Sequence, residues 1–298
     1  MDWDDLRVFL AVARSESLSG AGKRLALDPA TVGRRIARLE ERAGMLLFAR
    51  SPQGYALTEE GARLIPHAEA AEAAAAGAAE ALSQAEGAGG LAGQIRLGAP
   101  DGCANYLLPP VVAAICRANP GLEVQIVALP RVFNLSRREA DMAIGVSRPQ
   151  AGRLTVQKLT DYHLSLAAHP DYLAGAPPIH SLSDLRGHRV VGYIHDMIFD
   201  KELDYLGELG ITHVDAASNS VPVQLQLLRA GAGIGVVHDF ALPQAPELVR
   251  LLPEAVRLTR AFWLIRHEGD ARSSRLNRFA DALAQGIRRE VQRLEPLS

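Results

Sequence analysis

The stretch LSGAGKRLALDPATVGRRIARLEERAGMLLFARSPQGYAL, residues 18–57, decides the fold of the N-terminal part of the chain. Within it, Asp28–Arg42 predicts one helix, because Asp28 is a good N-cap and Pro29 fits the first helical position, where its missing N–H costs nothing. Helical spacing predicts one buried stripe, made of Val32, Ile36, Leu39 and Ala43. A second stripe lies about 110° round the same helix and contains Thr31, Arg34, Arg35, Arg38 and Arg42. This helix is expected to dock with one face and to present cations with the other.

The segments on either side of this helix indicate that residues 1–60 form a DNA-binding unit, which we call the head. Ser19–Ala26 predicts a compact helix of small residues, separated from the next helix by the spacing of a helix-turn-helix. After the second helix, two short apolar runs flank Pro52-Gln53-Gly54 and predict a hairpin, or wing. Between Lys23 and Arg50 there are seven Lys or Arg against three Asp or Glu, and phosphate attraction needs such a local excess. An ordinary solvated charged face is the alternative reading of the arginines, and these neighbours argue against it.

The first sixty residues resemble the N-terminus of a LysR-type transcriptional regulator. The matching residues are Leu6, Phe9, Ala13, Leu18, Ser19, Ala21, Leu25, Arg34, Ile36, Leu39, Glu40, Gly44, Leu47, Phe48, Arg50, Leu57, Thr58 and Gly61. The chain departs from the family where the recognition helix opens, because Asp28-Pro29-Ala30-Thr31-Val32-Gly33 stands in place of the common Ser-Gln-Pro-Ala-Leu-Ser. The family's usual operator sequence is therefore not carried over. Our candidates for DNA contact are Ser19, Thr31, Arg34, Arg35, Arg38, Arg50 and Gly54.

Length and composition limit the remaining possibilities. A chain of 298 residues with 48% hydrophobic content fits about two domains with ordinary cores, and a net charge of −2 confines any nucleic-acid surface to a local patch. The acidic start Met1–Asp5 does not resemble a signal peptide, and no apolar run is long enough for a membrane span. We therefore expect a cytoplasmic protein with no membrane partner. Cys103 and Cys116 are expected near opposite ends of one helix, too far apart for a disulfide.

An alanine-rich segment follows the predicted head. Residues 68–88 contain twelve alanines, which a flexible low-complexity linker would also explain. Because alanine is the best helix former, we expect instead one helix from Thr58 to about Glu86, with Thr58 as its cap. Its small-residue face suits close pairing with a second copy. The family resemblance implies the same arrangement, a linker helix that forms a homodimer.

From Gly93 onward, the pattern alternates strands and helices and predicts an α/β sandwich with largely parallel sheets. The expected strands are 95–98, 122–127, 142–146, 164–168, 189–193, 234–237 and 262–266, and the expected helices are 105–117, 203–209, 222–229 and 272–294. This half resembles the effector domain of the same family, which is similar to a type 2 periplasmic binding protein with two α/β lobes. The expected crossings between lobes lie near Asp161 and His267.

We therefore predict an α/β protein with an all-α-dominated winged helix-turn-helix at its N-terminus. The expected domains are the DNA-binding domain at 1–60, a linker helix at 61–92 and an effector-binding domain at 93–298. Lobe I would comprise about 93–162 and 268–298, and lobe II about 163–267.

No motif predicts catalysis, a cofactor or a metal site. The glycines of Gly231–Gly235 follow a predicted helix and precede a strand, which is the reverse of a dinucleotide-binding fingerprint and indicates a tight turn. The nine histidines show no metal-ligand spacing, and no nucleophile elbow of the form Gly-x-Ser-x-Gly occurs. We expect no enzyme activity.

Ligands of two-lobed α/β folds lie outside the carboxyl ends of the strands, where helix N-termini offer free N–H groups. Our effector-binding candidates follow strands or open helices and are Asp101, Gly102, Cys103, Arg131, Tyr193, Asp196, Asn219, Ser220 and His238. Each is equally well explained as a cap or a surface turn. Relatives often place a Ser or Thr near Gly102 to hold an effector carboxylate, and here Asp101 adds negative charge instead. Arg131, which follows the strand ending at Val127, would restore positive charge there. The set predicts a small polar effector that carries a hydroxyl or an amine beside any acid group, rather than a plain aromatic acid.

These features predict a transcriptional regulator whose partners are a double-stranded DNA operator and a small-molecule effector. The resemblance implies a homodimer through the linker helix, a homotetramer built from such dimers, and contact with RNA polymerase if the protein is an activator. A solute-binding protein or an enzyme that shares the two-lobed fold is the alternative, and it leaves the first ninety residues unexplained.

Overall fold

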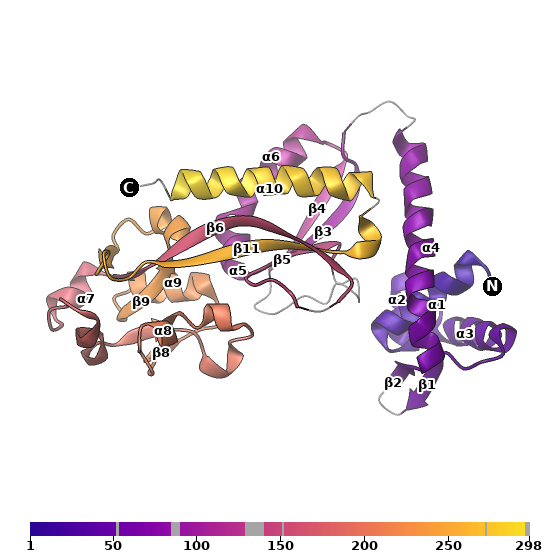
Figure 1. The fold of residues 1–298 in the computed structure, drawn as a ribbon, viewed down its shortest axis with the longest axis horizontal. Coiled ribbons are helices and arrows are strands. Elements are labelled where there is room, and N and C mark those ends of the chain that lie inside the picture. The colour runs from indigo at the N-terminus through magenta and orange to yellow at the C-terminus, as the bar shows by residue number, and fades with distance from the viewer. Residues whose placement is uncertain (52–53, 85–89, 129–139, 151, 272, 296–298) are drawn as a thin grey trace. The chain divides into compact units, whose positions relative to one another are not determined.

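The computed structural model describes residues 1–51, 54–84, 90–128, 140–150, 152–271 and 273–295. These residues divide into two compact units, one built on Met1–Gly89 and the other on Gly90–Phe133, Ala140–Arg266 and Arg278–Ser298. Figure 1 labels the helices and strands of both units.

The N-terminal unit is a winged helix-turn-helix. Its elements are α1 (Trp3–Ser15), α2 (Leu18–Leu25), α3 (Pro29–Ala43), β1 (Phe48–Ser51), β2 (Gly54–Leu57) and α4 (Glu59–Gln84). The predicted cap of α3 is confirmed, since the Asp28 carboxylate accepts the backbone N–H of Ala30 at 2.8 Å. Of the four residues of the predicted stripe, Ala43 at the end of the helix is half-buried, and the other three are confirmed as buried, because Val32, Ile36 and Leu39 are at most 1% exposed. These side chains join Phe9 and the rest of the head's core.

Two close backbone approaches shape the head. A side chain at Gly22 would place its Cβ 2.5 Å from the carbonyl oxygen of Leu27, so only glycine fits where α2 turns into α3. A Cβ at Gly54 would lie 2.4 Å from the carbonyl oxygen of Glu16, and Gly54 has φ +131°. The next residue, Tyr55, donates its N–H to the same oxygen at 2.9 Å. The wing is thereby anchored to the turn between α1 and α2.

The linker segment is helical over its described length, as predicted. Thr58 caps α4, because its hydroxyl accepts the N–H of Gly61 at 3.0 Å and donates to the carbonyl of Leu46 at 2.8 Å. The helix runs through Pro66. Arg14 of α1 is buried and donates to both carboxylate oxygens of Glu72, at 2.8 and 2.7 Å. This ion pair ties the middle of α4 to α1. The predicted end of the helix near Glu86 lies outside the described residues.

The second unit contains a nine-stranded mixed sheet. Its strands are β3 (Gly93–Ala99), β4 (Leu122–Ala128), β5 (Met142–Gly145), β6 (Leu154–Ala168), β7 (Val190–Gly192), β8 (Ala216–Ala217), β9 (Ile234–His238), β10 (Val249–Leu251) and β11 (Leu258–His267). They lie in the order β4-β3-β5-β11-β6-β9-β7-β8, with β10 beside β6. All the strands predicted from the sequence are present, and β8 and β10 were missed.

The sheet explains how the two lobes are joined. Pairing is parallel within lobe I, between β3 and its neighbours, and within lobe II, between β7 and its neighbours. It is antiparallel where β6 meets β9 and where β11 meets β5. The expectation of largely parallel sheets therefore holds inside each lobe and fails at the two long strands that connect them. Asp161 lies within β6, and β11 pairs with β5 from Trp263 to Arg266.

Helices cover this sheet. They are α5 (Asp101–Tyr106), α6 (Leu108–Ala118), α7 (Pro170–Ala174), α8 (Tyr205–Glu208), α9 (Val221–Arg229) and α10 (Ser274–Leu294). Short 3₁₀ turns occupy Leu182–Gly187, His195–Met197, Lys201–Leu203, Asp239–Gln244 and Glu268–Asp270. Helix α10 lies along β6, and its Arg288 donates to the carbonyl of Leu159 at 2.7 Å (Figure 1).

Three local predictions were wrong. The predicted helix 105–117 is two helices, and the first begins at Asp101, in the predicted turn. The break falls before Pro109 and Pro110, which lack the N–H groups that a continuous helix would use. Cys103 and Cys116 consequently lie on different helices, and both are free. The predicted helix 203–209 shrinks to the single turn α8, which contains Gly207 and stops before Gly210.

Candidate DNA-binding surface and effector pocket

The outward face of α3 presents two arginines. Arg34 and Arg38 are exposed, on the side of the helix away from its buried stripe, and Thr31 is half-buried beside them. The Arg34 guanidinium donates to the Thr31 hydroxyl at 2.9 Å, which orients both side chains on the same surface. We call Thr31, Arg34 and Arg38 the recognition face.

The other two arginines of the predicted stripe contact acidic residues of α1. Arg35 lies 3.9 Å from the carboxylate of Asp4, and Arg42 lies 3.1 Å from that of Asp5. The Asp5 side chain is 9% exposed, so the second pair is partly shielded from water. The sequence spacing placed all four arginines on one stripe, and the packing of α1 against α3 divides them into two pairs.

The remaining DNA-contact candidates lie around this face. Ser19 is exposed on α2, and Arg50 is exposed on β1. The Arg50 guanidinium lies 5.7 Å from the centre of the Tyr55 ring across the hairpin and 3.9 Å from the Glu40 carboxylate. Gly54 begins β2, where its backbone approach to Glu16 supplies a structural reason for the glycine.

Glu40 is a head residue whose role was not predicted. Its side chain is buried, although it belongs to a charged stretch of α3. One carboxylate oxygen accepts the backbone N–H groups of Leu47 at 2.9 Å and Phe48 at 3.1 Å. In the sequence Glu40 is one of several charged residues of α3. Nothing in that pattern distinguishes the buried acid from its exposed neighbours.

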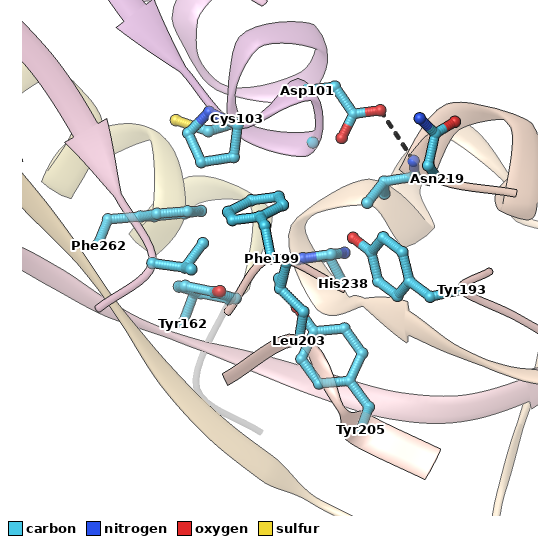
Figure 2. A pocket seen from close by; sticks show the side chains of 14 residues that line it. Asp101, Cys103, Tyr162, Tyr193, Phe199, Leu203, Tyr205, Asn219, His238 and Phe262 are labelled. Atoms are coloured by element: carbon cyan, nitrogen blue, oxygen red, sulfur yellow. Dashed lines mark hydrogen bonds between the residues drawn. The ribbon is translucent and has the colours of Figure 1, made fainter. Parts of the chain in front are cut away.

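A small pocket lies between the two lobes of the second unit, with a cavity volume of about 10 Å³, which is room for about one water molecule. Its lining includes Asp101 and Cys103 from α5, Tyr162 from β6, His238 from the end of β9 and Phe262 from β11. Figure 2 shows these side chains converging from different elements, with Tyr193 and Asn219 on the side of lobe II. This is the cleft pocket.

The structure places six of the nine predicted effector residues in the lining of the cleft pocket: Asp101, Gly102, Cys103, Tyr193, Asn219 and His238. Ser220 precedes α9 and hydrogen-bonds Asp101 through its side chain. Asp196 is exposed in a 3₁₀ turn and is not among the lining residues. Arg131 lies outside the described residues.

Sequence reasoning missed much of the aromatic wall. Tyr162, Phe199, Tyr205 and Phe262 also line the pocket, and the Tyr162 and Phe262 rings stack at 4.2 Å between centroids. Tyr162 and Phe262 belong to the two long connecting strands, whose pairing no local pattern reveals. The alternation of side chains along β6 and β11 predicts which residues of each strand face inward. It does not predict which ring of the other strand each of them contacts.

Burial controls the ionisation of the pocket. It lowers the pKa of His238 to about 3, so this imidazole is neutral at pH 7. It also raises the pKa of Asp101, against hydrogen bonds from Ser220 and from the backbone N–H of Val221. Desolvation likewise raises the pKa of the Cys103 thiol, which makes this cysteine an unreactive core group at neutral pH.

A second pocket, with a cavity volume of about 460 Å³, lies in lobe II beside β7 and α8. Most of its lining is aliphatic, with Val191, Ile194 and Leu206 as examples, and it shares Tyr193 and Tyr205 with the cleft pocket. It is larger, but it is lined from one lobe. The cleft pocket is the better candidate for a site that senses a ligand between lobes.

Two further searches cover the described residues. No helix there combines the length and apolarity that a membrane span requires. No three His, Cys, Asp or Glu side chains gather there in an arrangement that fits a metal ion.

Comparison with known families assigns both units. Residues 3–62 match the family described as bacterial regulatory helix-turn-helix protein, lysR family. Residues 88–288 match the LysR substrate binding domain.

Individual proteins show the same relationship over nearly the whole chain. The transcriptional regulator CrgA of Neisseria meningitidis is 27% identical over 95% of this chain and 96% of its own. The transcriptional activator TtdR of Escherichia coli is 28% identical over 94% of this chain and 92% of its own.

Solved structures agree. The structure of CrgA from Neisseria meningitidis matches with a TM-score of 0.57 and 26% identity over 96% of this chain and 99% of that one. A full-length OxyR variant from Pseudomonas aeruginosa shares the fold with a TM-score of 0.71 and 22% identity, over 97% of this chain and 95% of that one. Together with the two domain matches, these similarities show that the chain belongs to the LysR family, whose members are DNA-binding transcriptional regulators that respond to small-molecule effectors.

Proposed function

We propose that the protein regulates transcription by reading a double-stranded operator with the recognition face of α3. The observation that carries this proposal is the exposed pair Arg34 and Arg38 on the face of α3 opposite its buried stripe. A helix of this kind fits the major groove, where arginine pairs with base edges and phosphates. Thr31 and Arg34 lie nearest the N-terminus of the helix, the end that enters the groove in helix-turn-helix proteins.

The wing and α2 complete the proposed surface. Ser19 and Arg50 are exposed and offer a hydroxyl and a guanidinium to the phosphate backbone, and Gly54 keeps the wing against the head. Arg35 contacts Asp4, so we assign it both to phosphate attraction and to holding α3 against α1.

We further propose that α4 pairs two copies into a homodimer. Ala70, Ala74 and Ala78 recur every four residues and are exposed along one side of α4, which suits close helix packing. Two heads held this way would read a pseudo-palindromic site, and pairs of dimers would form a homotetramer. If the protein activates transcription, it also contacts RNA polymerase. We propose that it works in the cytoplasm.

The effector role falls to residues 93–298, with residues 1–60 as the DNA-binding domain and 61–92 as the linker helix. The cleft pocket lies between strands and helices of both lobes, so a small polar ligand there changes how the lobes are held. Such a ligand can shift the geometry of the assembly and thereby its fit to the operator.

Footprinting on the DNA upstream of the protein's own gene, with and without a metabolite panel, tests this function. We expect a protected site with two half-sites, and at least one metabolite that changes the protection. A chain that lacks residues 1–90 should lose all specific DNA binding. If DNA binding were absent from the full chain while a metabolite bound tightly, the solute-binding alternative would replace this proposal.

A further inference from the structure

Three buried polar atoms in the cleft pocket have no hydrogen-bond partner among the described residues. They are the hydroxyls of Tyr162 and Tyr205 and Nδ1 of His238. Their side chains are deeply buried, with exposed fractions of 0%, 4% and 6%. The hydroxyls of Tyr162 and Tyr205 are close enough to act on each other as a weak hydrogen-bonding pair, so Nδ1 of His238 is the one of the three with no polar neighbour among the described residues. Leaving a buried polar atom unsatisfied is unfavourable, so this end of the pocket is suited to meet a polar atom of a ligand.

Among the described residues, the pocket lining carries one acid and no lysine or arginine. The acid is Asp101, and no described cation forms an ion pair with it. The nearest guanidinium to the Tyr205 ring is that of Arg260, at 5.6 Å, and it is already bound by Glu202 and Glu208. Among the described residues, no positive side chain lies in the pocket to balance an anionic ligand beside this carboxylate, and the cost of such a pair of anions rises with burial.

The N-terminus of α9, where an anionic ligand could otherwise bind, is occupied by the Asp101 carboxylate. Helix α9 has nine residues, and its first N–H group, on Val221, donates to the Asp101 carboxylate at 2.9 Å (Figure 2). The Ser220 side chain hydrogen-bonds the same carboxylate. The partial positive charge of a helix N-terminus attracts carboxylates. In this protein that position in lobe II holds the protein's own acid from lobe I.

The rest of the wall is aromatic. Phe199 projects into the middle of the pocket, between Asp101 and the rings of Tyr162 and Tyr193 (Figure 2). Ring faces attract organic cations within about 6 Å, and this attraction grows as water is excluded. A carboxylate next to several rings is the combination that recognises an ammonium group.

We propose that the cleft pocket widens between the lobes to bind a small organic amine in its protonated form, with the ammonium group beside Asp101 and Phe199 and a neutral hydrogen-bonding group at the Tyr162–His238 end. This inference rests on the proposed function, because it names the chemical class of the effector for the same site. Burial raises the pKa of Asp101, and a bound ammonium group would return it toward its ordinary value. The carboxylate therefore gains a counter-charge only when the ligand is present.

Matched ligands test the charge preference in the full-length chain. One series keeps a phenol and varies the other end: tyramine, tyrosol and 4-hydroxyphenylacetate. A second series is aliphatic: 4-amino-1-butanol, 1,4-butanediol and 4-hydroxybutyrate. Calorimetric titration should give the amine of at least one series a Kd about tenfold or more below that of its carboxylate, equivalent to about 1.4 kcal/mol. A carboxylate that binds as tightly as its amine, or two amines that both fail to bind, would overturn the proposal.

Two variants locate the ammonium group. Asp101→Asn keeps an oxygen for the Val221 N–H, and it should weaken the amine about tenfold while leaving the alcohol unchanged. Asp196→Asn is the matched control, an exposed acid outside the pocket, and it should change neither. Phe199→Leu keeps an apolar side chain and removes the ring, so the amine should lose more affinity than the alcohol. Equal losses for amine and alcohol in both variants would contradict the assignment.

Operator binding is measured in parallel, so that the two proposals fail separately. If a carboxylate alone alters the footprint, the regulatory function stands and the amine class is wrong. If amines bind with the predicted preference and the footprint never changes, the ligand class stands and the effector role of the pocket is wrong.

Discussion

One carboxylate oxygen of Glu40 lies 2.9 Å from the backbone nitrogen of Leu47 and accepts its hydrogen bond. The same oxygen accepts the N–H of Phe48 at 3.1 Å, where β1 begins. A residue on α3 therefore fixes where the wing starts. Because α3 carries the recognition face, this bond also couples the helix and the wing, the two parts of the head that we expect to touch DNA.

Replacing Glu40 with alanine is expected to destabilise the DNA-binding head. The change leaves two buried N–H groups without an acceptor, at about 1–3 kcal/mol for each. Urea denaturation of the full chain should show a transition of the head shifted to lower concentration. Glu41→Ala is the control, because the neighbouring Glu41 is exposed, and its effect should stay within about 0.5 kcal/mol. Equal effects of the two substitutions would show that the Glu40 bonds contribute no net stability.

Replacing Arg34 with alanine is expected to weaken specific operator binding by about 1–3 kcal/mol, the usual contribution of an arginine that reads a base. Binding to unrelated DNA should change less, because phosphate contacts are shared by all sequences. Electrophoretic mobility shifts on operator and scrambled duplexes measure both. Arg42→Ala is the control, since Arg42 contacts Asp5 of α1. Operator affinity that survives Arg34→Ala would contradict its place on the recognition face.

Arg38→Ala and Arg35→Ala are expected to act through phosphates. Each should weaken all duplexes by a similar factor, and each lost phosphate contact should lower the slope of log affinity against log salt by about 1. Arg35 also contacts Asp4, so its removal should cost some head stability as well. A titration between low and high salt gives the slopes, and a loss confined to the operator would assign these arginines to bases instead.

Placing glutamates at Ala74 and Ala78 is expected to split the dimer. Both positions are exposed and one helical turn apart on α4, so four carboxylates would meet in a close helix pair. Light scattering should report a smaller assembly, and operator affinity should fall with it. Ala62→Glu is the control, about 120° round the same helix and also exposed. An unaltered assembly would show that this side of α4 is not the dimer contact.

Acid is expected to destabilise the effector domain through His238. Its folded-state pKa is lowered to about 3 from an ordinary value of 6.5, so the unfolded chain binds more protons between these values. The stability that His238 contributes is present above about pH 6.5 and falls by up to about 1.4 kcal/mol per pH unit below it. The raised pKa of Asp101 acts in the opposite direction, because its contribution is lost as pH rises.

Comparing His238→Phe with the wild type isolates this contribution. Unfolding free energies measured from pH 7 to pH 4 should fall less steeply in the variant, whose side chain cannot take up a proton. His195→Gln is the control, since His195 is exposed, and it should keep the wild-type slope. Identical slopes for His238→Phe and the wild type would show that His238 gains no proton on unfolding.

The sequence alone determined the helices and strands whose signals are local. Asp28 and Pro29 place the start of α3, Thr58 places the start of α4, and the apolar spacing of Val32, Ile36 and Leu39 gives the buried side of α3. Caps and periodicity act within a few residues, so they can be read without a structure. The helix-turn-helix and the two-lobed α/β class follow from the order of such elements.

Only the tertiary structure decided which of these residues meet. Arg42 contacts Asp5 while Arg34 stays exposed on the same helix, because α1 packs beside one edge of α3 only. Tyr162 and Phe262 are a hundred residues apart, and the neighbouring strands β6 and β11 bring their rings together in the cleft pocket. Asp101 reaches the first N–H of α9 from the other lobe. Contacts between distant segments depend on strand order and burial, which the local sequence does not encode. The charge and chemistry of the pocket are therefore visible only in the folded chain.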